Sequence, residues 1–240
     1  MSLYSDAEYP ISADTEKLHT DEILSYARPG TWGTAAQRTA IAATARKVRS
    51  DAGVQESIGD EGLASKTALS KPAQRVATAV ALGGVEIDRT FCEKAQADGV
   101  TEGEYVEIVG LVSRLAHLDV FARGIGVPSR RLREPVDDKE PSCERPLEAK
   151  REGFFTETIP SEPEGGALAK SIFGKGPTPN ILRSLSLVPD EARRLNAILN
   201  QEYFSVETIM NFDSSSHETL SRPQIEIIAA KVSELNQCFY

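Results

Sequence analysis

The chain has 240 residues and a formal net charge of −9 at pH 7, with 40% hydrophobic and 26% charged residues. These proportions are typical of a soluble globular protein, and the acidic balance argues against a nucleic-acid partner, because phosphate binding requires a basic surface. No apolar run approaches the roughly 20 residues of a membrane span, so we expect no membrane association. The first residues lack the pattern of a signal peptide, and we expect a cytoplasmic protein.

The cysteine content is low and irregular. Cys92, Cys143 and Cys238 are odd in number and unevenly spaced, which is not typical of a secreted disulfide framework. We interpret Cys92 as a buried core thiol and Cys143 as a thiol of a linker. Cys238 is the candidate for chemistry.

The first hundred residues predict helices after a polar start. Residues 1–30 are polar and predict an arm that packs on a larger body, such as a neighbouring subunit. Residues 34–50 are rich in alanine and lack glycine and proline, which favours a helix. Residues 71–82 and 86–97 predict two more helices, separated by a pair of glycines. Strand patterns are almost absent along the chain, so the predicted fold class is all-α.

Residues 101–124 predict a long helix that begins with a capping box of Thr101 and Glu104. At an offset of 120 residues this segment aligns with the end of the chain, so that Thr101 meets Ser221 and both copies share a V-S-x-L pattern. The common cap and apolar positions suggest an internal repeat. At the positions of chemical interest the copies differ, because Val106 aligns with Glu226.

A proline-rich stretch separates the two copies. Its prolines exclude a long helix, and its length indicates a crossover on the surface, with a short helical piece near residues 166–172. Residues 180–187 and 189–210 predict two further helices. The predicted organisation is an arm (1–30), a first helical repeat (31–134), a crossover (135–178) and a second repeat (179–240).

The final stretch combines a strong helix signal with two reactive side chains. Ser221 and Gln224 predict a second capping box, and the residues after them form an apolar face at helical spacing. That face consists of Ile225, Ile228, Ala229, Val232 and Leu235. Glu226 lies near the start of this helix, and Cys238 follows it by twelve residues.

The segment LSRPQIEIIAAKVSELNQCFY at residues 220–240 resembles the peroxidase-related branch of the AhpD/carboxymuconolactone decarboxylase superfamily. Redox-active members carry a glutamate twelve positions before a Cys-x-x-Cys pair, with a histidine four positions after the second cysteine. Glu226 and Cys238 match the first two elements, and the second cysteine would fall at position 241. The segment NILRSLSLVPDEARRL at residues 180–195 is also similar to the family.

The resemblance implies an all-α, AhpD-like fold of two repeats and thiol-dependent reduction of a hydroperoxide. Cys238 would be one member of the redox pair, Glu226 the proton relay, and Tyr240 an assistant to that relay. No metal or organic cofactor is implied, and a thiol reductant protein would supply electrons to a homo-oligomer. With no second cysteine beside Cys238, we expect weak turnover or none from these 240 residues.

Simpler interpretations remain open. A lone cysteine is often inert, and a carboxylate in the first turn stabilises a helix without any catalytic role. The chain would then be a non-redox, decarboxylase-like enzyme or a catalytically degenerate oligomeric scaffold. Twelve residues of straight helix would separate Glu226 and Cys238 by about 18 Å, so cooperation requires a break, for which Asn236 is the candidate as the N-cap of a following helix.

A metal site is not predicted. His117, Asp119 and Glu107 share one predicted helix, but they lack the paired histidines of helical zinc motifs. His19 and His217 have no ligand-like neighbours in the sequence.

Overall fold

The computed structural model describes residues 2–65, 67–136, 138–153, 155–175, 178–205, 208–209, 211, 213, 219–236 and 238. These residues form helices and no sheet, which confirms the all-α prediction. One isolated antiparallel bridge joins Lys150 and Thr158, with hydrogen bonds of 2.9 and 3.0 Å. None of the helices formed by these residues combines the length and hydrophobicity needed to cross a bilayer.

The predicted helices are found near their expected places, except that the helix predicted over residues 189–210 ends at Glu202. The helical elements are α1 (Ala13–Tyr26), α2 (Ala35–Asp51), the 3-10 helix η1 (Glu61–Ser65), α3 (Lys71–Ala81), α4 (Arg89–Ala97), α5 (Glu102–Gly124), α6 (Gly166–Phe173), α7 (Asn180–Arg183), α8 (Pro189–Glu202) and α10 (Arg222–Leu235). Helix α7 is shorter than predicted because the Ser184 and Ser186 hydroxyls bond to the carbonyls of Ile181 and Arg183, which favours a turn.

Capping side chains set where the long helices begin. At α5 the Thr101 N–H donates to Glu104 Oε2 (2.8 Å) and the Glu104 N–H donates to Thr101 Oγ1 (3.2 Å), which confirms the predicted capping box. Thr34 and Gln37 form the same box at α2. Each box satisfies backbone N–H groups that a helix start leaves without intrahelical partners.

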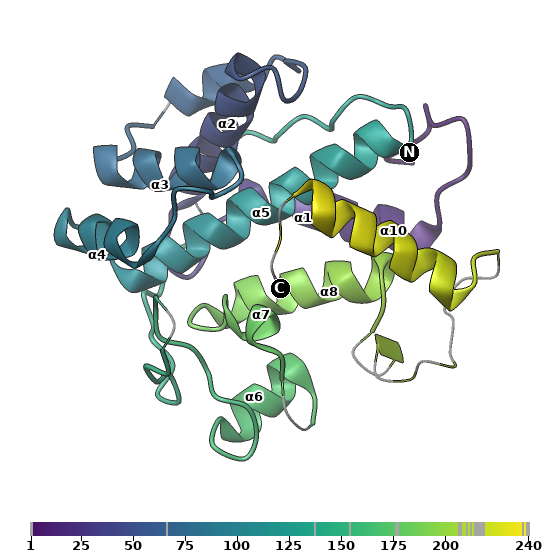
Figure 1. The fold of residues 1–240 in the computed structure, drawn as a ribbon. Helices are drawn as coiled ribbons and strands as arrows, with labels where there is room; N and C mark the ends of the chain where they lie inside the picture. The colour runs from purple at the N-terminus through teal and green to yellow at the C-terminus, as the bar shows by residue number, and fades with distance from the viewer. Residues whose placement is uncertain are drawn as a thin grey trace. The chain divides into compact units, whose positions relative to one another are not determined.

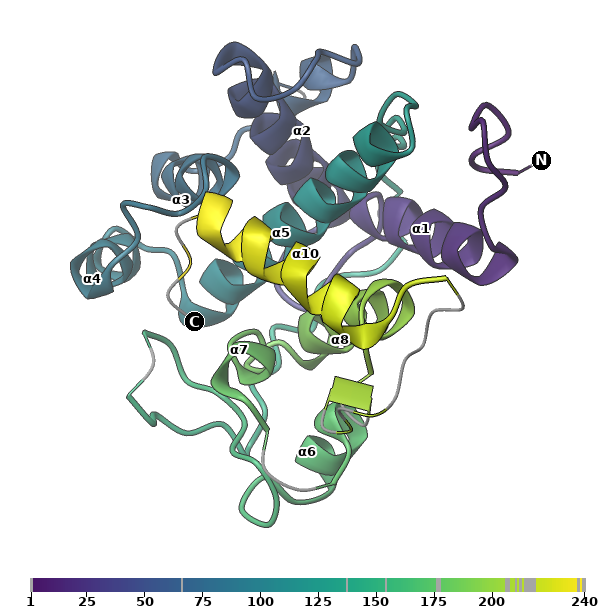
Figure 2. The same cartoon turned by 45° about the vertical axis from the view of Figure 1, so that its right-hand side comes forward.

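The chain divides into two compact units, residues 1–196 and 197–240. In the first unit α5 runs through the middle, and α2 and α3 pack against it (Figure 1). Figure 2 shows α4 near the start of α5 and the first residues of the chain near its end. Leu111, Val112 and Leu115 of α5 are fully buried in the largest hydrophobic cluster.

The second half of the predicted N-terminal arm, residues 1–30, forms a helix. Residues 13–26 form α1, in which Tyr26 and His19 are fully buried and Glu22 is almost so. Few apolar residues mark the buried side of this helix, so its hydrophobic pattern is weak. The burial is stabilised by polar partners on other elements, which the sequence of α1 alone does not contain.

A network of buried charges joins four helices of the first unit. Glu191 of α8 pairs with Arg114 of α5 and, at 3.2 Å, with Arg38 of α2. Arg114 also pairs with Glu22 of α1, and Arg38 also pairs with Glu107 of α5. Because an unpaired buried charge is strongly destabilising, these pairs restrict how the four helices can dock.

The two central carboxyls of this network differ in their electrostatics. Burial alone would raise the pKa of Glu191, but Arg114 and Arg38 hold that pKa below its usual value. Burial raises the pKa of Glu107, and Arg38 offsets only part of that effect. The charged form of Glu191 therefore stabilises the fold at neutral pH, and this contribution is lost as the pH falls below about 4.5 and through the lowered pKa.

We predict that Glu191→Gln lowers the free energy of unfolding by about 3–5 kcal/mol, because it leaves two buried arginines with too little negative charge. The matched control is Asp190→Asn at the preceding residue, whose ion pair with Arg193 is exposed and should change stability by less than about 1 kcal/mol. Urea unfolding followed by circular dichroism measures both. Equal stability of the two variants would contradict the assigned role of the network.

Candidate functional site

The candidate site lies in the second unit, where α10 leads to Cys238. Gln224 Oε1 accepts hydrogen bonds from the Ser221 N–H (2.8 Å) and hydroxyl (3.0 Å), as the predicted cap requires. The helix ends at Leu235, and Asn236 is its C-cap. The predicted break at Asn236 is therefore present. The helix predicted to follow Asn236, and the position of Tyr240, fall outside the described residues.

Cys238 is exposed directly after the end of α10. Its backbone N–H donates to the carbonyl of Ser233 at 2.9 Å, which holds the residue against the last turn of the helix. An exposed thiol at this place is accessible to a dissolved oxidant or to the thiol of another protein. Accessibility is one of the two conditions for cysteine reactivity, the other being its thiolate fraction.

Glu226 has two side-chain partners within the second unit. Arg222 Nε donates to Glu226 Oε1 at 2.5 Å, and the Tyr203 hydroxyl donates to Glu226 Oε2 at 3.0 Å. Burial, and then the hydrogen bond to this carboxylate, raise the pKa of Tyr203. Glu226 is therefore part of a small polar cluster and does more than stabilise the start of its helix.

The structure does not bring Glu226 into contact with Cys238. The helix is continuous from Glu226 to Ser233, and the seven steps between these two residues rise about 10 Å along the axis. Cys238 is attached to the far end of that rise through its bond to Ser233. A direct hydrogen bond between the carboxylate and the thiol is excluded in this arrangement, so any proton transfer between them requires intervening groups.

Arg222 belongs to the candidate site and was not singled out from the sequence. Its guanidinium donates to the carbonyls of Thr208 (2.9 Å) and Ile209 (3.2 Å), and it lies 4.3 Å from the centroid of the Phe204 ring. It thereby ties the segment before α10 to Glu226. The four-residue spacing of Arg222 and Glu226 is a known helix pairing and was the signal available in the sequence.

The other two cysteines differ in their exposure to solvent. Cys92 is buried in the main core, as predicted, and burial raises the pKa of its thiol. Cys143 is exposed in the long connection before α6, and its φ of 52° is unusual for a residue with a side chain. All three cysteines are free thiols, so Cys238 is not paired with Cys92 or Cys143 in a disulfide.

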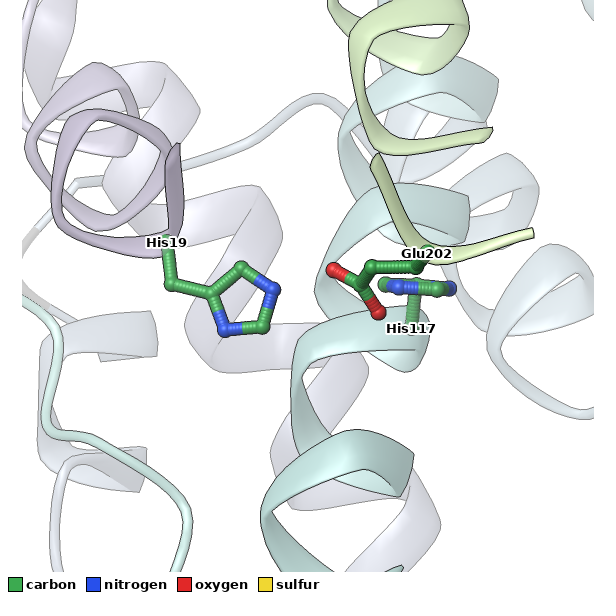
Figure 3. A group of neighbouring side chains, drawn as sticks. All are labelled: His19, His117 and Glu202. Atoms are coloured by element: carbon green, nitrogen blue, oxygen red, sulfur yellow. The ribbon is translucent and has the colours of Figure 1, made fainter. Parts of the chain in front are cut away.

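Two histidines that are distant in the sequence come together in the first unit. The imidazoles of His19 on α1 and His117 on α5 have centroids 6.4 Å apart (Figure 3). His19 Nδ1 is 2.7 Å from the Tyr4 hydroxyl, and its ring packs edge-on against Phe121. Glu202, also drawn in Figure 3, belongs to the second unit. His217 lies outside the described residues.

No family model, curated protein or solved structure matches the chain. Membership of the AhpD/carboxymuconolactone decarboxylase superfamily therefore stays a prediction that rests on the C-terminal residues. The two-repeat organisation stays a prediction as well.

We predict that the native chain titrates two thiols with a soluble aromatic disulfide such as DTNB, and that the third reacts only in denaturant. The exposed thiols of Cys143 and Cys238 should react, whereas the Cys92 thiol is shielded by the core. Cys238→Ser should leave one reactive thiol, and Cys143→Ser is the matched control with the same count. Two reactive thiols remaining in Cys238→Ser would show that Cys238 is not accessible.

Proposed function

We propose that this chain is an AhpD-like, thiol-dependent hydroperoxide reductase in which Cys238 is the reacting residue. The observation that carries the proposal is an exposed cysteine at the end of a capped helix that bears Glu226 twelve residues earlier. The substrate is a hydroperoxide, and the electron donor is a thiol reductant protein. The reaction uses sulfur chemistry alone and needs no metal or organic cofactor.

The proposed first step forms one bond and breaks one. The Cys238 thiolate attacks the outer oxygen of the hydroperoxide, so that an S–O bond forms as the O–O bond breaks. Sulfur is oxidised to a sulfenic acid, and the peroxide is reduced to an alcohol once its leaving oxygen accepts a proton. A thiol then attacks the sulfenic acid, forming a disulfide and releasing water. That thiol comes from the reductant protein or from a second cysteine placed near Cys238.

Glu226 is proposed as the proton relay for this step. Its separation from Cys238 requires that the proton move through water or through other side chains, with Tyr203 already bonded to the carboxylate. Arg222 is proposed as a positioning residue, because its ion pair and its bonds to backbone carbonyls orient Glu226. The proposed role of Tyr240 is to extend this relay.

A second candidate function is an oligomeric scaffold without redox activity. Helix α10 exposes several large apolar side chains, among them Ile227 (70% exposed) and Leu235 (72% exposed). Such side chains on one helix favour association with another protein surface. Self-association as a homo-oligomer stays a prediction for either function, and light scattering on the full chain tests it.

We predict that the chain consumes about one equivalent of a small alkyl hydroperoxide rapidly and then turns over slowly with a dithiol donor. Cys238→Ser should reduce consumption to the uncatalysed rate, whereas Cys143→Ser should leave it unchanged. Adding a cysteine at position 241, after Tyr240, should raise turnover because it supplies a resolving thiol next to Cys238. In that extended chain, Glu226→Gln should slow consumption about tenfold or more.

Hydroperoxide consumption that survives Cys238→Ser would place the chemistry elsewhere. Consumption that is absent from both the 240-residue chain and the extended chain would favour the scaffold.

A further inference from the structure

The first unit contains a cavity of about 620 Å³ whose described lining includes no residue of the candidate site around Cys238. The cavity is lined on one side by α5. Its other lining residues come from the turn between α3 and α4, the segment around Phe155, and the residues after α7. A volume of this size is typical of pockets for small molecules. Its apolar lining includes Val80, Ile87, Val106, Val109, Val112 and Leu185.

Among the described residues, a single charged residue lines this cavity. Arg49 comes from α2 and is 95% buried, and no acidic residue accompanies it among the described residues of the lining. The guanidinium donates to the carbonyls of Ala81 (3.3 Å) and Val112 (3.2 Å). The described lining is therefore apolar with one positive group. Such a lining favours a ligand that has an apolar tail and a negatively charged head group.

The charge of Arg49 is compensated less completely than that of its neighbour Arg46. Asp119 binds Arg46 through two bonds of 2.6 and 3.1 Å, and Asp60 adds a third at 2.5 Å. The same Asp119 is 3.5 Å from Arg49, at the limit of a hydrogen bond. Burial lowers the pKa of Arg49 and Asp119 offsets only part of this, whereas the carboxylates raise the pKa of Arg46 despite its burial.

Arg49 also has donors to spare. A guanidinium carries five N–H groups, and three acceptors lie within hydrogen-bond distance of Arg49 in the described part of the chain. Two N–H groups of Arg49 therefore remain for a ligand. A carboxylate, with two oxygens and one negative charge, matches this requirement in number and in charge. A dianion would introduce a second charge that nothing in the described lining compensates.

From this arrangement we infer that the cavity binds a small amphipathic monocarboxylate, such as a medium-chain fatty acid, with its head group at Arg49 and its tail along α5. The inference is independent of the chemistry proposed for Cys238, since every residue it uses belongs to the first unit. It assigns to that unit a ligand-binding role of its own.

The test compares octanoate with octan-1-ol, a neutral ligand with a tail of the same length, by isothermal titration calorimetry on the full chain. Wild-type protein should bind one octanoate per chain, at least about tenfold more tightly than octan-1-ol, because a charge-assisted hydrogen bond is stronger than a neutral one. Arg49→Met should remove this preference while still binding the alcohol, and Arg49→Lys should retain part of it. Asp119 keeps its two bonds to Arg46 in both variants, so we expect both to fold.

A second variant tests the location without changing any charge. Ala116→Trp places a large side chain at the cavity wall and should weaken both ligands by tenfold or more. The inference is overturned if wild-type protein shows no saturable binding of octanoate, or if it binds octan-1-ol equally well. Octanoate binding that is unchanged in Arg49→Met or in a folded Ala116→Trp would also overturn it.

Discussion

The pairing of buried arginines with buried carboxylates is the constraint on which the first unit depends. Helix α2 buries Arg38, Arg46 and Arg49, and their acceptors lie on α1, α3, α5, α8 and the segment after α2. Removing such charges from water is costly unless each finds an opposite charge and further hydrogen bonds. The helices therefore have few alternative dockings, and we infer that the network fixes their register more than it adds net stability.

Close backbone approach is part of the same constraint. A side chain at Gly110 of α5 would bring its Cβ to 2.5 Å from the Glu191 carboxylate, and one at Gly30 would meet both Glu107 and Arg38. Glycine is a poor helix former, so Gly110 weakens α5 locally. That cost is offset because the absence of a side chain at Gly110 leaves room for the Glu191 carboxylate to pair with Arg114. A separate group of buried charges lies beside the cavity, where Asp119 is bonded to Arg46 and leaves Arg49 with spare donors.

Local features of the fold were predictable from the sequence, and long-range ones were not. The capping boxes at Thr101 and Ser221 and the alanine-rich segment of α2 depend on residues three or four apart, which a sequence shows directly. Helix α1 was missed because its buried residues include His19 and Glu22, whose partners lie on other elements. The pair of Arg38 and Glu191 spans 153 residues, a separation that no local pattern encodes.

The same division holds for the candidate site. Glu226, Cys238 and the end of α10 were identified from spacing, whereas the bond from Tyr203 to Glu226 joins residues 23 apart in the sequence. The predicted repeat would connect the two sites: if α5 and α10 are equivalent, Val106 in the cavity wall corresponds to Glu226.

The central claim is that Cys238 is the residue a hydroperoxide oxidises. The most direct measurement is to treat the full chain with one equivalent of alkyl hydroperoxide, trap sulfenic acid with dimedone, and locate the adduct by peptide mass spectrometry. The account predicts dimedone on Cys238 and little on Cys143, because both thiols are exposed but the proposed proton relay from Glu226 serves Cys238 alone. Equal labelling of the two cysteines, or label on Cys143 alone, would contradict it.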